Sequence, residues 1–147
     1  MKRIILMVIL LAANFGIGAC SQSESPILAT EALAVEDQAS LLAAMQDAGG
    51  TVEVVDSVDQ VFFSPQGSII SVNGADIQVF EYESPEAMEA EAAQVAPDGG
   101  SIGTSMVTWV DTPHFYKTGH IIVLYVGSDA ATLDLLETVI DSQFAGR

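Results

Sequence analysis

The segment SIISVNGADIQVFEY (residues 68–82) decides how this chain folds. Its two halves, residues 68–72 and 75–82, are rich in β-branched and aromatic residues and alternate apolar with polar positions, as strands do. Asn73-Gly74 joins them, and this pair favours the left-handed backbone conformations of a type I′ turn. The segment therefore predicts an antiparallel β-hairpin.

Further strands are expected on both sides of the hairpin, because similar β-rich runs precede and follow it. A nearly continuous apolar run is typical of a strand at the middle of a sheet, which places residues 120–126 there. The other predicted strands are Thr51–Asp56, a short piece at Val61-Phe62-Phe63, and Ile102–Val110, where Met106, Thr108 and Val110 share one side and Val107 and Trp109 the other. Thr112–Gly119 is expected to be a connecting loop.

Three helices are predicted from apolar residues at helical spacing and from their capping residues. The first runs from about Glu36 or Asp37 to Ala48 and ends at Gly49-Gly50. The second opens at Ser84-Pro85-Glu86 and reaches Val95 or Ala96. The third is capped by Ser128 or Asp129, carries Leu133, Leu136, Ile140 and Phe144 on one face, and stops at Gly146.

This order of elements predicts an α+β fold, a two-layer sandwich with a mainly antiparallel sheet of four to five strands and about three helices. Residues 36–147 are too few for two domains and form a single domain. A ferredoxin-like split βαβ unit around Phe80 to Val126 is the alternative arrangement, although no clear strand follows the last helix.

The N-terminus has the three parts of an export signal. Lys2 and Arg3 form a cationic start, and Ile4–Phe15 is an uncharged apolar run shorter than the ~20 residues of a spanning helix. The sequence Ile17-Gly18-Ala19-Cys20 follows and resembles the lipobox of bacterial lipoprotein signal peptides. The resemblance implies that residues 1–19 are cleaved and that Cys20 becomes acylated. An uncleaved signal anchor is the alternative.

Cys20 is the single cysteine of the chain, so a disulfide within the chain is excluded and lipidation explains the residue instead. Several acyl chains hold a protein firmly on a membrane, whereas one does not. Residues 20–35 are polar near the cysteine and predict a flexible linker between the anchor and the domain. By similarity to lipoprotein sorting, Ser21 favours the outer membrane if the cell has one.

The charge of the chain restricts its partners. Cleavage would remove Lys2 and Arg3 and leave two basic residues against 20 acidic ones, a formal charge of −18. Such a surface repels nucleic acid and anionic lipid, so the membrane is expected to be bound only through the lipid anchor. The acidic residues are spread along the chain, as on a solvated surface; a surface that collects cations or a basic partner is the alternative.

Several short segments beyond the lipobox are similar to those of a group of small bacterial lipoproteins of unknown function. They are residues 73–82, Pro97-Asp98-Gly99, Trp109-Val110, Pro113-His114-Phe115-Tyr116, residues 123–127 and residues 143–147. This resemblance covers most of the chain after Cys20. It implies the location and the fold, and assigns no activity to any residue.

The only basic cluster of the predicted domain is formed by His114, Lys117 and His120, in or beside the expected loop. It is the candidate ligand-binding site, where an acidic ligand would find positive charge. The histidine spacing is unlike that of a zinc site, and no calcium-loop pattern occurs. No serine is expected in a Gly-x-Ser-x-Gly nucleophile elbow, and Gly100-Ser101 is typical of a turn. No metal, cofactor or catalytic residue is therefore predicted.

The sequence thus predicts an exported, membrane-anchored lipoprotein that acts without catalysis, by binding an envelope partner or supporting an envelope assembly. The alternative is a small envelope enzyme or acidic-ligand-binding protein that uses the site at His114, Lys117 and His120.

Overall fold

A computed structural model describes residues 34–146 of the chain. The predicted signal peptide, Cys20 and nearly all of the predicted linker lie outside the described residues. The part described has three helices, α1 (Gln38–Asp47), α2 (Pro85–Ala92) and α3 (Ala130–Ile140). Its strands are β1 (Val52–Val58), β2 (Gly67–Val72), β3 (Ala75–Glu81), β4 (Ser101–Ile102), β5 (Ser105–Met106), β6 (Pro113–Thr118), β7 (Ile121–Val126) and β8 (Ala145–Gly146).

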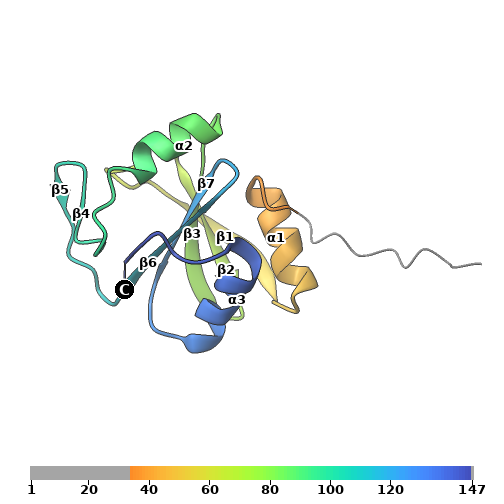
Figure 1. Cartoon of the computed structure of the whole chain (residues 1–147). Coiled ribbons are helices and arrows are strands. Elements are labelled where there is room, and N and C mark those ends of the chain that lie inside the picture. Colours follow the sequence, from red (N-terminus) through yellow and green to blue (C-terminus); the bar gives the residue numbers. More distant parts are fainter. Residues whose placement is uncertain (1–33, 147) are drawn as a thin grey trace, which may run out of the picture. The chain divides into compact units, whose positions relative to one another are not determined.

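Six of these strands form one sheet in the order β1-β2-β3-β7-β6-β8, in which all neighbours pair antiparallel, and β4 pairs with β5 in a separate small hairpin (Figure 1). The expected α+β sandwich with a mainly antiparallel sheet and three helices is confirmed. The main sheet has six strands, one more than the upper number predicted.

The segment between β3 and β7 contains a split βαβ unit. Strand β7 pairs antiparallel with both β3 and β6, so β3 and β6 run parallel with β7 between them, and the chain connects them through α2. The alternative arrangement is thus present locally. A complete ferredoxin-like sheet is not formed, because β2 occupies the place beside β3 and the short β8 after α3 pairs with β6 at the other edge.

The predicted β2–β3 hairpin is confirmed. Val72 pairs with Ala75, and the two residues between them, Asn73 and Gly74, have φ angles of 53° and 91°. These positive angles are those of a type I′ turn, whose twist matches the twist of the strands that it joins. The Asn73 side chain also accepts a hydrogen bond from the backbone N–H of Thr51, which holds the start of β1 beside the turn.

The loop predicted at Thr112–Gly119 is wrong, because residues 113–118 form β6, which pairs with β7 along its whole length. Pro113 occupies the first position of the strand, where the missing N–H is tolerated. Residues 113–116 are all buried, since both faces of β6 are covered. A strand covered on both faces loses the alternation of apolar and polar residues that marks a half-exposed one.

Other predicted elements are shorter than expected. Ile102–Val110 is not one strand: the chain turns at Gly103, which has a φ angle of 56°, and only the two-residue strands β4 and β5 form. Helix α2 ends at Ala92, before the predicted Val95. Helix α3 ends at Ile140, and Gly146 lies in β8 opposite His114 rather than at a helix stop. No strand is formed at 61–63, where the chain turns.

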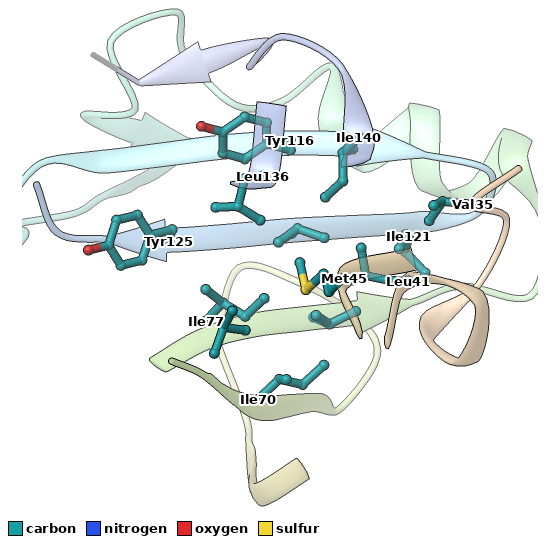
Figure 2. Close-up of a cluster of buried hydrophobic side chains, with 13 residues drawn as sticks. Val35, Leu41, Met45, Ile70, Ile77, Tyr116, Ile121, Tyr125, Leu136 and Ile140 are labelled. Carbon is teal, nitrogen blue, oxygen red and sulfur yellow. The ribbon is translucent and has the colours of Figure 1, made fainter. Parts of the chain in front are cut away.

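The two faces of the main sheet carry two separate clusters of buried side chains. Helices α1 and α3 pack on one face, where Leu41, Met45, Leu136 and Ile140 meet side chains of the strands (Figure 2). Helix α2 and the segments beside β4 and β5 pack on the other face around Phe80, Phe115 and Leu124. The covered second face explains why residues 121–125 of β7 and 113–116 of β6 are buried without interruption.

The helices begin at the predicted caps. Asp37 accepts a hydrogen bond from the backbone N–H of Ser40, whose side chain in turn accepts from the Asp37 N–H. The side chains of Ser84 and Asp129 likewise accept from backbone N–H groups three residues on, at the starts of α2 and α3. The hydrogen bonds from Ser40 lower the pKa of the Asp37 carboxyl, since they favour its ionised form.

Strand β1 is one edge of the sheet and is mostly exposed on both of its faces. Val55 interrupts its pairing with β2, because Val54 lies opposite Ile70 and Asp56 opposite Ile69. This β-bulge bends the edge strand and increases its twist.

Tyr116 on β6 buries a hydroxyl group that has no hydrogen-bond partner among the residues that the structure describes. The side chain is fully buried, and burial together with the nearby charge of Glu137 raises its pKa to about 12. An unpartnered buried hydroxyl costs free energy, so Tyr116→Phe should raise the free energy of unfolding by about 1 kcal/mol. Urea denaturation followed by circular dichroism measures the change.

The matched control is Tyr125→Phe on the neighbouring strand. The Tyr125 hydroxyl accepts a hydrogen bond from the Asp129 N–H, and its removal should lower stability by about 1 kcal/mol. Equal destabilisation by both substitutions would show that the Tyr116 hydroxyl is satisfied.

Candidate binding surface

His114 is part of the folded framework and does not face solvent. It lies on β6 opposite Tyr125, is 6% exposed, and stacks on the Tyr125 ring with 6.0 Å between ring centroids. Its Nδ1 is 2.7 Å from Oε1 of Gln143, and its Nε2 is 3.1 Å from the carbonyl oxygen of Gly127. Both ring nitrogens are therefore engaged by the segments on either side of α3.

Lys117 lies on the opposite face of β6, because it is an odd number of positions from His114 and strand side chains alternate. Its ammonium group forms an ion pair with Glu89 of α2 and lies 5.3 Å from the centre of the Phe144 ring. This contact joins α2 to the segment that follows α3. Lys117 is thus neutralised by a carboxylate of its own chain.

His120 lies in the turn between β6 and β7 and is held by other segments. Its Nε2 is 3.5 Å from Oε1 of Glu81 on β3. Its backbone N–H donates to the carbonyl of Glu36, and its backbone carbonyl accepts from the N–H of Tyr82. The predicted basic cluster of His114, Lys117 and His120 is not brought together, since the three side chains lie on two faces of a strand and in a turn.

The expectation that no serine lies in a Gly-x-Ser-x-Gly motif is wrong at the level of the sequence, because residues 99–103, Gly99-Gly100-Ser101-Ile102-Gly103, match its letters. A nucleophile elbow needs the serine at a sharp turn from a strand into a helix. Here Ser101 is the first residue of β4 and pairs with Met106 in the β4–β5 hairpin. The local structure is therefore a hairpin, which does not present a serine nucleophile in that way.

A different surface stands out at the end of the domain that carries β4 and β5. Three large apolar side chains there are almost fully exposed: Val61 (95%), Met106 (92%) and Val110 (99%). We call these three residues the apolar rim. Met106 and Val110 lie on one side of the segment predicted to alternate, and that alternation of exposed and less exposed residues is present although the predicted strand is not.

The apolar rim flanks a row of aromatic rings that leads into the core. Phe62 lies between Phe63 and Trp109, with centroid distances of 5.0 and 6.0 Å, and Trp109 lies 5.8 Å from Phe115. The indole N–H of Trp109 donates to the carbonyl of Gly99 at 2.7 Å. Val61 precedes Phe62 and Val110 follows Trp109 in the chain, so rim residues adjoin rings that are held in place.

Beside Trp109 the surface has a groove of about 510 Å³, which we call the tip groove. Asp98 and Asp111 supply its carboxylates, and each accepts a short-range hydrogen bond from a backbone N–H through Oδ1. Its lining residues are Asp98, Gly100, Val107, Thr108, Trp109, Asp111, Thr112 and Pro113. An aromatic ring, apolar side chains and two carboxylates thus share one hollow.

Two smaller hollows are weaker candidates for a binding site than the tip groove. One of about 320 Å³ beside α2 contains Glu91, but Glu91 already accepts hydrogen bonds from the Tyr82 hydroxyl and from Ser64. The other, of about 280 Å³, lies between the end of α1 and α3. Within residues 34–146, no group of three or more His, Cys, Asp or Glu side chains is arranged to hold a metal ion.

The helices between Ala34 and Gly146 are all too short or too polar to cross a membrane. Comparison of the chain with protein-family models, with curated proteins and with solved structures found no match. The choice of the tip groove and the apolar rim as the candidate site therefore depends only on their geometry.

Proposed function

We propose that this chain is an exported lipoprotein, anchored to a membrane through Cys20, whose domain acts by binding a partner and not by catalysis. Export and lipid anchoring are supported by the order of Lys2-Arg3, the apolar run and Ile17-Gly18-Ala19-Cys20. Lipid anchoring is further supported by the single cysteine, since exported proteins usually pair their cysteines and lipidation explains one that has no partner. Ser21 favours the outer membrane where a cell has one.

The observation that carries the binding role is the exposed apolar rim beside the tip groove. A single exposed apolar residue is common on protein surfaces, whereas large exposed apolar side chains next to the residues of a hollow are typical of a binding site. The histidine and lysine of β6 are engaged by Gln143, Gly127 and Glu89, which leaves an enzyme-like or acid-binding use of that segment without a supporting contact.

Cleavage before Cys20 and acylation of Cys20 are tested by mass spectrometry of the full chain, expressed in a bacterium that has an outer membrane. The mature protein should begin at Cys20, carry the mass of its acyl chains, and sediment with the membranes in high salt. Cys20→Ser should remove the acyl mass. A wild-type product that begins at Met1 or carries a free thiol would refute the assignment.

A matched control keeps one cysteine but moves it. The double variant Cys20→Ser/Ser23→Cys places the thiol three residues beyond its place after Ile17-Gly18-Ala19. We expect it to remain unacylated, because the lipobox context is lost. Acylation of this variant would show that the thiol, rather than the sequence before it, determines the modification.

A further inference from the structure

We propose that the tip groove binds a cationic and partly apolar polypeptide segment. In this arrangement an arginine or lysine side chain lies over Trp109 between Asp98 and Asp111, and neighbouring apolar side chains cover the apolar rim. The inference rests on the proposed binding role and adds the chemistry of the partner.

The charge of the domain selects a cationic partner. Between Ala34 and Gly146 the sequence has 18 acidic residues, no arginine and one lysine, and that lysine is paired with Glu89. A second copy of the chain, an anionic lipid surface or a nucleic acid would meet like charge at this face. A basic segment is attracted to it, and complementary charge both steers association and discriminates against other partners.

Trp109 is suited to hold a cation because its ring is held in place by its neighbours. Its N–H is committed to Gly99, and its contacts with Phe62 and Phe115 fix the orientation of the ring. A tryptophan face attracts ammonium and guanidinium groups more strongly than other aromatic rings do. The backbone N–H groups that follow Asp98 and Asp111 bond to Oδ1 of each carboxylate, so the second oxygen can accept from an incoming N–H donor.

The apolar rim explains why the partner must also carry apolar side chains. Val61, Met106 and Val110 are each more than nine-tenths exposed, and covering them removes apolar surface from water. A free amino acid or a small amine would fill the groove without reaching the rim. A polypeptide in which basic and apolar residues are close together fits both parts.

The position of the site leaves it accessible in an anchored protein. Helix α1, the first element after the predicted linker, packs on one face of the main sheet, whereas Trp109 and Phe62 belong to the cluster on the other face. Figure 1 shows α1 and the β4–β5 hairpin on opposite sides of the sheet. The partner can therefore reach the groove without displacing α1.

Trp109 is the only tryptophan of the chain, so its fluorescence reports on the groove. The full acylated protein in nanodiscs of neutral phosphatidylcholine is titrated with three five-residue peptide amides free of tryptophan. They alternate arginine with leucine, arginine with glycine, and glutamate with leucine. We expect a saturable change with the first peptide, binding about tenfold weaker with the second, and none with the third.

Two double variants separate the groove from general charge. Asp98→Asn/Asp111→Asn should weaken binding of the arginine–leucine peptide about tenfold, as expected for two partly exposed ion pairs. Asp47→Asn/Asp134→Asn removes the same charge from the α1 and α3 layer and should leave binding unchanged. Equal weakening by both pairs, or no saturable signal with the wild-type protein, overturns the proposal.

The rim and the other occupants are tested with the same protein. Met106→Ser/Val110→Ser changes only exposed side chains, and it should lower the affinity of the arginine–leucine peptide to that of the arginine–glycine peptide.

Sedimentation of the protein in neutral detergent should give a monomer. A dimer that Val110→Asp dissociates would identify a second copy of the chain as the occupant and refute the proposal. Mass spectrometry of Cys20 is independent of these titrations, so failure of the anchor and failure of the groove are distinguishable.

Discussion

Phe115→Ala is expected to lower the free energy of unfolding by about 3–5 kcal/mol, a large part of the total stability of a small domain. Phe115 is fully buried at the centre of β6, and its ring lies 5.8 Å from that of Trp109 and 6.1 Å from that of Phe144. The substitution leaves a cavity between the sheet and the segments that cover its second face. Urea denaturation followed by circular dichroism measures the loss.

The control for Phe115→Ala is Phe62→Ala in the same row of rings. Phe62 is only partly buried, so its truncation should cost about 1 kcal/mol, less than half of the expected loss at Phe115. Because the Phe115 ring supports Trp109, Phe115→Ala should also shift the tryptophan emission to the red in the folded protein. A loss no greater than that of Phe62→Ala would mean that the second cluster contributes little to stability.

Gly119→Ala is expected to destabilise the domain by on the order of 4 kcal/mol, through strain and through displacement of α1. Gly119 has a φ angle of 52° in the turn between β6 and β7. A Cβ atom there would overlap the carbonyl oxygen and the Cα of Glu36. Since the same carbonyl accepts from the His120 N–H, relief of the overlap moves the start of α1, whose Leu41 and Met45 are fully buried.

Gly49→Ala is the matched control for this turn. Gly49 also has a positive φ angle, 90°, but a Cβ atom there would meet nothing within 4 Å. Its replacement should therefore show only the backbone strain, about 1–2 kcal/mol. Hydrogen exchange of the α1 amides distinguishes the two variants, because only Gly119→Ala should speed their exchange. Equal stability losses would contradict the packing role of Gly119.

The parts of the fold that sequence predicted are those with a local cause. Asn73-Gly74 requires a turn whatever surrounds it, and Asp37, Ser84 and Asp129 cap helices through groups three residues away. The missed elements depend on tertiary contacts. Residues 113–118 are a strand because β7 and β8 lie beside them, and β8 is two residues long, too short to leave a pattern in the sequence.

The three basic residues of the predicted site are held apart for a related reason. His114, Lys117 and His120 are neighbours in sequence, but strand alternation and the turn separate their side chains. Aromatic residues usually lie in the core, and Trp109 does pack against Phe115. Trp109 also lines the tip groove. This position depends on the turn at Gly103 and on contact with Phe62, which is 47 residues away in the chain. Only the alternation of residues 106–110 gave a local signal.

The bulge at Val55 affects how readily the edge strand β1 can pair with strands of other molecules. Open edges of sheets invite strands of other molecules to pair with them, and proteins held at high density on a surface meet each other often. Here one border is bent at Val55 and carries Glu53 and Asp56, and the opposite border, β8, spans two residues. Other copies of the chain thus find no straight strand to extend, which protects against fibre-like aggregation.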